Sequence, residues 1–215
     1  MVKAKAAIKA ASVHPLDRAF FAGDPRKVAR NLLGKVLVRR LGRKMLAARI
    51  VEVEAYLGKD DPAAHSAAGR TLRNSVIFGP PGYAYVYFIY GNHYCLNVSC
   101  EPEGQAGCVL FRALEPLRGV KEMARARGII VESPRDLIRI TSGPGRLCEA
   151  FGITREHDNG ADLTSSRSDL WIGSDDFAAE NIVAVPRIGI TKAAEHPLRY
   201  LLAGNPFVSG RKMSV

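Results

Sequence analysis

Two hairpin signatures restrict the fold of this chain more than any other feature. Residues 35–41 and 44–57 are strand-like and flank a turn at Gly42, and residues 83–90 and 93–100 flank a two-residue turn at Gly91–Asn92. Strands joined by such short turns pair in the antiparallel sense. Short helices and further strands follow without a regular strand–helix alternation. The sequence therefore predicts an α+β fold with a largely antiparallel sheet.

The remaining elements are short. Capping residues and apolar runs predict helices at residues 25–33, 120–127 and 144–151, and strands at residues 106–116, 169–173 and 181–190. Residues 69–82 are the longest irregular stretch, and long loops in compact domains are often functional. No repeat or linker composition divides the chain. We expect one domain over residues 16–215 after a flexible basic arm of residues 1–15.

The charge of the chain indicates what it binds. Lys and Arg exceed Asp and Glu by 31 to 21, which gives a formal net charge of +10. Such a balance favours a polyanion such as nucleic acid, although a basic protein without that function has the same composition. The basic arm is either a DNA contact or a frayed terminus. The sequence contains neither a signal-peptide pattern nor a membrane-length apolar run, and it lacks a cysteine spacing typical of zinc, so we expect a cytoplasmic protein with buried, reduced thiols.

Two carboxylates alternate with valines near the end of the second predicted strand. Glu52 and Glu54 point to the same side, and if the valines face the core the glutamates line the opposite surface. An isolated pair of this kind is usually a solvated strand face. Here Tyr56 continues the face, and His65 and Arg73 follow in the loop. A carboxylate beside an aromatic wall can act as a general base, and carboxylates commonly cleave glycosidic bonds.

Two residues of the second hairpin have open interpretations. Tyr90 lies at its tip, where the ring either docks on a neighbouring loop or inserts between DNA bases as a wedge. Asn97 lies within an otherwise apolar strand, so its amide either makes a structural hydrogen bond or reads the edge of a base.

With these residues placed, the sequence resembles the alkyladenine (3-methyladenine) DNA glycosylases, a family with mammalian and bacterial members. The matching segments cover residues 16–210 and are ARNLLGKVLVRR, RIVEVEAYLGKDDPAAHS, GRTLRN, YVYFIYGNHYCLNVS, CVLFRALEP, SGPGRL, PRIGI and HPLRYLLAGNPFVS. The resemblance implies one α+β domain with a curved antiparallel sheet and a projecting hairpin. It also implies a monomer without metal or cofactor that flips damaged purines out of double-stranded DNA in base excision repair.

The resemblance assigns chemical roles position by position. The family's water-activating base falls on Glu54, and Arg112 matches the arginine that helps to hold the water. A backbone carbonyl that shares this water is expected at Ile188. Glu52 also matches the family pattern, but no role is assigned to it.

The resemblance also assigns base and DNA contacts. The rings that sandwich the flipped base fall on Tyr56 and Tyr87. Contacts to the base fall on His65 and on the backbone of Ala63. Asn97 matches the asparagine that crowds the 2-amino group of guanine, and the residue that fills the gap left by the flipped nucleotide falls on Tyr90.

The implied reaction is hydrolysis of the N-glycosidic bond of 3-methyladenine, 7-methylguanine, hypoxanthine or ethenoadenine. Lys59 is the one lysine of the core motif, so lyase chemistry through a Schiff base is not expected. Two other classes stay open: a non-enzymatic nucleic-acid binder, which would leave Glu54 and Arg112 unused, and an RNA-modifying or formyl-transfer enzyme with a similar sheet. The GNHY tip and the lack of a long N-terminal extension differ from the mammalian proteins, which bears on damage preference and DNA affinity rather than on the reaction.

Overall fold

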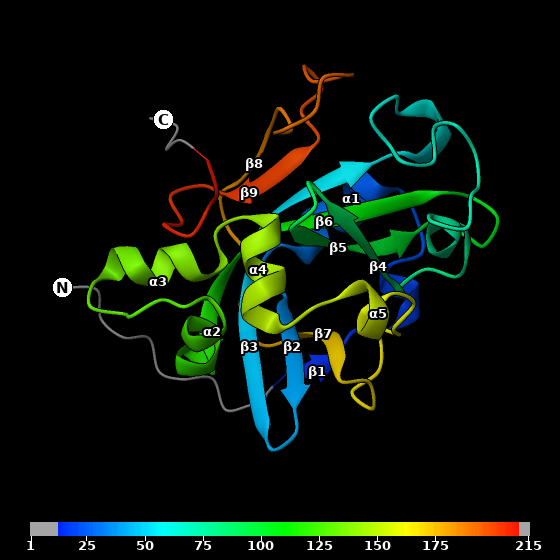
Figure 1. The fold of residues 1–215 in the computed structure, drawn as a ribbon. Helices are drawn as coiled ribbons and strands as arrows, with labels where there is room; N and C mark the ends of the chain where they lie inside the picture. Colours follow the sequence, from blue (N-terminus) through cyan, green and yellow to red (C-terminus); the bar gives the residue numbers. More distant parts are fainter. Residues whose placement is uncertain (1–12, 211–215) are drawn as a thin grey trace.

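A computed structural model describes residues 13–210, and these form a mixed α+β fold around one open sheet (Figure 1). Within this range the sheet has nine strands: β1 (His14–Pro15), β2 (Val36–Leu41), β3 (Lys44–Tyr56), β4 (Ala84–Ile89), β5 (His93–Cys100), β6 (Gly107–Arg118), β7 (Leu170–Ser174), β8 (Ile182–Val185) and β9 (Arg199–Leu202). The strand order is β1-β7-β2-β3-β6-β5-β4, and β9 pairs with both β3 and β8. Every pairing is antiparallel, which confirms the predicted fold class.

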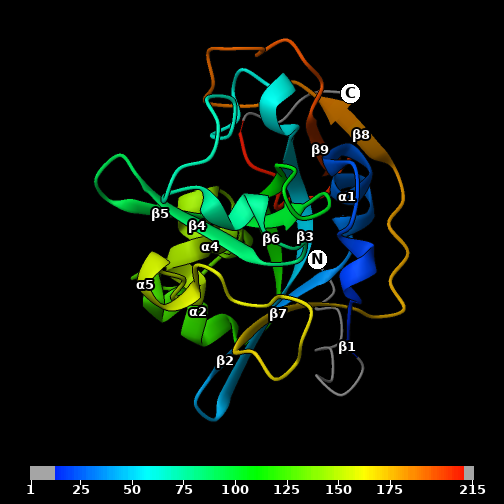
Figure 2. The ribbon, with the colours of Figure 1, turned by 90° about the vertical axis from the view of Figure 1, so that its right-hand side faces the viewer.

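Short helices cover both faces of the sheet. They are α1 (Pro25–Leu32), α2 (Val120–Ala126), α3 (Pro134–Thr141), α4 (Pro144–Phe151) and α5 (Arg155–Asp158). In Figure 2, α4 and α1 lie on opposite sides of β3 and β6. The Asp24 side chain accepts a hydrogen bond from the first turn of α1, and Gly152 ends α4, as expected. None of the described helices combines the length and apolar composition of a membrane span.

The strand β3 is the centre of the fold. It pairs with β2 along its first half, whereas its second half lies between β6 and β9. Glu54 is opposite Leu110 on one side and Arg199 on the other. The β3–β6 register shifts on both sides of Glu52, an irregularity of the kind that re-aims side chains beside active sites. This arrangement surrounds the carboxylates of β3 with residues from distant parts of the chain.

The second hairpin differs from the sequence prediction in its turn. Ile89 pairs with His93, so three residues form the turn instead of the expected two. Tyr90 and Gly91 both have positive φ, 54° and 72°, and Asn92 donates its N–H to the Ile89 carbonyl. Two successive left-handed residues match the right-handed twist of the strands, as in type I′ turns. The hairpin extends away from the body of the molecule, as expected (Figure 2).

The start of the folded region also differs from the prediction. Residues 1–12 of the expected arm lie outside the described residues. Val13 is buried against the sheet, and β1 pairs with β7. The fold therefore includes residues 13–15, which were expected to belong to the arm.

The turn that follows β3 contains a glycine, Gly58, whose backbone packs closely against Ala106. Gly58 has a φ of 80°, and a Cβ atom there would lie 2.0 Å from the carbonyl oxygen of Ala106. Gly128 also has positive φ, 60°, but a Cβ atom would meet nothing within 4 Å. We expect Gly58→Ala to lower the free energy of unfolding by about 1–3 kcal/mol more than Gly128→Ala does, because only the first clashes. Urea denaturation measures both, and equal losses would contradict this close packing.

Candidate active site

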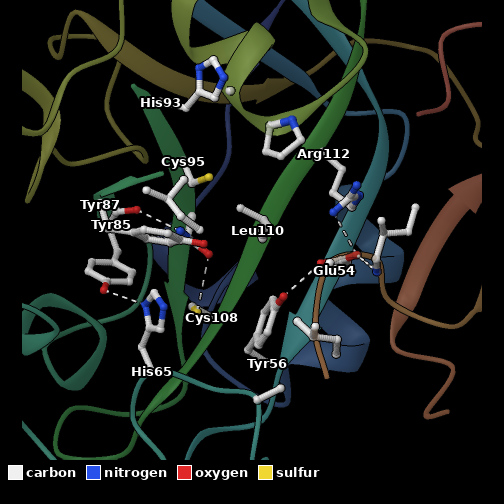
Figure 3. A pocket seen from close by; sticks show the side chains of 18 of the residues that line it. Glu54, Tyr56, His65, Tyr85, Tyr87, His93, Cys95, Cys108, Leu110 and Arg112 are labelled. Carbon is white, nitrogen blue, oxygen red and sulfur yellow. Dashed lines mark hydrogen bonds and ion pairs between the residues drawn. The ribbon is translucent and has the colours of Figure 1, made fainter. Parts of the chain in front are cut away.

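A single cavity of about 260 Å³ brings the predicted residues together (Figure 3). All nine line it: Glu54, Tyr56, Ala63, His65, Tyr87, Tyr90, Asn97, Arg112 and Ile188. The cavity lies between β3, β4, β5 and β6, and the first residues of α4, Pro144 and Gly145, line one side. Its volume is close to the lower end of small-molecule pockets, roughly 300 Å³.

The carboxylate of Glu54 accepts two hydrogen bonds and forms an ion pair with Arg112. Its Oε1 receives the backbone N–H of Ile188 at 2.8 Å and lies 3.1 Å from a terminal nitrogen of Arg112. Its Oε2 receives the hydroxyl of Tyr56 at 3.0 Å. An ionised carboxylate offers about four acceptor positions, two on each oxygen. Oε1 accepts the Ile188 N–H and faces the Arg112 guanidinium, whereas Oε2 accepts only the Tyr56 hydroxyl, so an acceptor position is left on Oε2.

The two glutamates do not form a solvated strand face, which is the usual interpretation of such a pair. Glu52 and Glu54 are both 0% exposed. The chain that follows β8, the strand β9 and the C-terminal segment supply donors to these side chains and cover them. The Nε of Arg112 donates to Glu52 at 3.1 Å. Burial alone would lower the pKa of Arg112, but the two carboxylates outweigh it and hold that pKa above its usual value.

An ion pair supports Tyr56 from behind. The Arg187 guanidinium lies 4.6 Å from the centre of the Tyr56 ring, pairs with the buried Asp61, and donates to the Ala55 carbonyl at 3.0 Å. Burial raises the pKa of the Tyr56 hydroxyl, and the neighbouring Glu54 raises it further, so this group stays a donor. Burial would also raise the pKa of Asp61, but Arg187 and the N–H groups of Ala63 and Leu57 lower it overall.

A second aromatic group forms the other wall. The His65 ring packs edge-on against Tyr87, with centroids 4.5 Å apart, and its Nδ1 lies 3.0 Å from the Tyr85 hydroxyl. Burial lowers the pKa of His65, and Arg73 lowers it further, which favours a neutral imidazole. Burial raises the pKa of Tyr85 to about 12, so its hydroxyl stays protonated. A hydroxyl that donates to Nδ1 leaves the ring proton of His65 at Nε2.

Asn97 is fixed at the base of the cavity. Its Nδ2 donates to the Tyr85 carbonyl at 3.1 Å, and its Oδ1 lies 3.8 Å from the Cys108 sulfur. The structural interpretation of this amide is therefore correct, and its position in the cavity leaves a role in base selection as a proposal. The Ala63 N–H donates to Asp61 at 3.1 Å, so the carbonyl is the backbone group with which Ala63 could meet a base.

The Tyr90 side chain is not packed into the fold. It is 79% exposed at the mouth of the cavity, which contradicts the alternative that it docks on a neighbouring loop. An exposed non-glycine residue in the left-handed region is unusual and is a feature from which function is inferred.

Comparison with known proteins decides between the open classes. The model of the methylpurine-DNA glycosylase family matches residues 19–206. The chain belongs to this family. It is therefore a DNA glycosylase, a hydrolase of DNA repair.

The relatives carry the provisional name 3-methyladenine DNA glycosylase. One from Koribacter versatilis is 64% identical over 94% of this chain and 96% of its own length. Others come from Anaeromyxobacter dehalogenans, 46% identical over 90% of this chain and 85% of its own length, and from Alkaliphilus oremlandii, 43% identical over 90% and 98%.

The glycosylase has further cavity residues that the sequence did not single out as site residues. Tyr85, Cys95 and Cys108 line the inner wall, and His93 lies beside Gly145 at the start of α4. Tyr85 was detectable, because it shares a strand face with Tyr87. The cysteines were expected only as buried thiols, and all four of the chain are free and buried. Among residues 13–210, no group of three or more His, Cys, Asp or Glu side chains is arranged to hold a metal.

The ion pair behind Tyr56 generates a stability prediction. Arg187→Met should lower the free energy of unfolding at neutral pH by about 3–5 kcal/mol, because it leaves a carboxylate buried without its partner. The exposed pair of Arg40 and Asp169 is the control, and Arg40→Met should cost about 1 kcal/mol or less.

Folding lowers the pKa of Asp61, so the stability from this carboxylate is present at neutral pH and is lost in acid, below about pH 4. Urea denaturation across this pH range measures both effects; equal losses for the two variants would argue against the burial argument.

Proposed function

We propose that this glycosylase flips alkylated or deaminated purines out of duplex DNA and hydrolyses their N-glycosidic bond with a water activated by Glu54. The substrates proposed are 3-methyladenine, 7-methylguanine, hypoxanthine and ethenoadenine. The observation that carries the proposal is the Glu54 carboxylate, which is buried, accepts two hydrogen bonds, pairs with Arg112 and has an acceptor position left on Oε2 beside an aromatic-walled cavity.

The chemical step uses that acceptor position. A water donates one hydrogen to Oε2 of Glu54, its oxygen bonds to C1′, and the bond between C1′ and the purine nitrogen breaks. The proton released by the water goes to Glu54, and the bond electrons leave with the base. The transition state resembles an oxocarbenium ion, so a carboxylate close to the sugar also stabilises the developing positive charge. Arg112 and the Ile188 N–H fix the carboxylate so that it does not need to reorganise. We propose that the Ile188 carbonyl also orients the water.

The cavity walls select the base. A flipped purine is read by stacking and by contacts to its edge, and here it would stack between Tyr56 and Tyr87. The guanidinium carbon of Arg187 lies 4.6 Å from the centre of the Tyr56 ring, and that of Arg73 lies 5.6 Å from the centre of the Tyr87 ring. Neither arginine lines the cavity. His65 presents its Nε2–H to an acceptor on the base. The fixed Asn97 amide occupies the space that the 2-amino group of guanine would need.

The charge of the damaged base determines whether it must be protonated in order to leave easily. Purines alkylated at ring nitrogens carry a positive charge and leave as neutral bases once the glycosidic bond breaks. Hypoxanthine and ethenoadenine are neutral and leave more easily when they gain a proton. The net charge of +10 favours binding of a monomer to duplex DNA, and the exposed Tyr90 would fill the gap left by the flipped nucleotide.

Glu54→Gln isolates the chemistry, because it keeps the side-chain size and removes the base. Single-turnover release of hypoxanthine should fall by roughly 10²–10⁴-fold, while binding to lesion DNA persists. Glu103→Gln, on the exposed turn before β6, is the matched control. If Glu54→Gln releases hypoxanthine at the rate of the unaltered enzyme, Glu54 is not the base. If the protein binds lesion DNA but releases none of the four bases, the proposed substrates are wrong.

Tyr90→Ala tests the wedge. The side chain is 79% exposed, so its removal should leave thermal stability unchanged but shorten the lifetime of the flipped state, because nothing then fills the stack. Stopped-flow fluorescence of ethenoadenine in duplex DNA follows flipping directly. Ile130→Ala is the control, since Ile130 is equally exposed and lies on the loop between α2 and α3. Normal flipping by the Tyr90 variant would refute the role.

A further inference from the structure

Glu52, to which the sequence assigned no role, is a buried carboxylate bound from two sides. Its Oε1 accepts from the Nε of Arg112 at 3.1 Å, from Arg199 at 2.9 Å and from the Ser209 hydroxyl at 3.0 Å. Its Oε2 accepts the backbone N–H of Ser209. Ser209 is itself buried. Ser209, seven residues after the end of β9, is therefore bonded directly to the central strand.

These contacts fix the guanidinium of Arg112 at three points. Its Nε points to Glu52, one terminal nitrogen lies 3.3 Å from the Ser209 hydroxyl, and the other lies 3.1 Å from Glu54. A planar guanidinium held by three partners in different directions has one orientation. Ser209 and Glu52 thus determine which edge of Arg112 faces Glu54.

Arg199 extends the same network to the other donor of Glu54. Its Nε donates to the Pro186 carbonyl at 2.8 Å, two residues before Ile188, while a terminal nitrogen donates to Glu52. The backbone that supplies the Ile188 N–H is therefore tied to Glu52 as well.

The network also balances charge. Two carboxylates, Glu52 and Glu54, face two guanidinium groups, Arg112 and Arg199. Without the Glu52 charge, one positive charge would be left uncompensated close to a sugar that becomes cationic in the transition state. In a buried site such a charge is weakly screened and would slow bond cleavage.

We propose that Ser209 and Glu52 are positioning residues for the glycosylase reaction, through which the C-terminal segment orients Arg112 against Glu54. The inference rests on the proposed function of Glu54. It assigns to the last described residues a part in catalysis without any contact with the base or the DNA.

Three substitutions test this positioning role. Ser209→Ala removes the hydroxyl that bonds both Glu52 and Arg112, Ser209→Thr keeps a hydroxyl at the same atom, and Glu52→Gln removes the charge. Single-turnover release of hypoxanthine should slow about 10-fold in Ser209→Ala and up to roughly 100-fold in Glu52→Gln, because a misplaced catalytic group loses rate on this scale. Ser209→Thr should restore most of the rate. The Kd for lesion DNA should change less than threefold in all variants.

The control is Ser142→Ala. The Ser142 hydroxyl lies 3.5 Å from the Val208 carbonyl, so this variant loosens the same segment without touching Glu52, and its rate should stay close to that of the unaltered enzyme. Equal rates for Ser209→Ala and Ser142→Ala, or a loss in Ser209→Ala that appears only in Kd, would overturn the inference. If Glu52→Gln does not fold, the comparison of Ala and Thr at position 209 decides.

The outcomes separate the two proposals. If Glu54→Gln is inactive while the Ser209 and Glu52 variants release hypoxanthine at the normal rate, the inference fails and the proposed function stands. If the unaltered protein releases none of the proposed bases, the proposed function fails, and the inference fails with it.

Discussion

Two buried glutamates on one strand, Glu52 and Glu54, need hydrogen-bond donors, and several distant parts of the chain supply them. A buried carboxylate without partners costs several kcal/mol. The donors come from Arg112 on β6, Arg199 on β9, Ile188 after β8 and Ser209 near the C-terminus. They reach β3 because its second half is paired on both edges. Sheet order and site geometry are thus consequences of the same constraint.

Local signals in the sequence predicted most of the elements but not how they cover one another. The hairpins, α1 and α4 were predictable because turns and caps depend on residues within a few positions. The burial of Glu52 was not, because its partners lie 60 to 157 residues away along the chain. An acidic strand face with no visible partner has the pattern of a solvated surface. The strand β9 was missed because it is only four residues long. The helix α3 was missed although a local signal marks its start, a capping box of Ser133 and Asp136 with Pro134 in its first turn.

The candidate site was predicted from the resemblance rather than from residue patterns. Motif positions placed nine residues in one cavity, although the pair Glu52 and Glu54 alone is a weak signal. The motifs include Arg187 and Cys108 but do not indicate that these residues support the cavity, Arg187 behind Tyr56 and Cys108 beside Asn97. The turn at Tyr90 was placed one residue short, because Gly91–Asn92 alone satisfies the two-residue pattern. Support contacts depend on three-dimensional packing, which short motifs do not encode.

The exposure of Tyr90 has an energetic consequence for any duplex that this enzyme meets. A tyrosine ring buries roughly 150–250 Å² when it is fully covered, and apolar burial contributes about 25 cal/mol per Å². The ring contributes almost none of this to folding, because it is 79% exposed. Its transfer into a base stack would therefore release up to a few kcal/mol, which is comparable with the cost of unstacking one nucleotide. If Tyr90 enters the stack as proposed, the apolar surface that the hairpin tip leaves exposed in the free protein would be buried only in the complex with DNA.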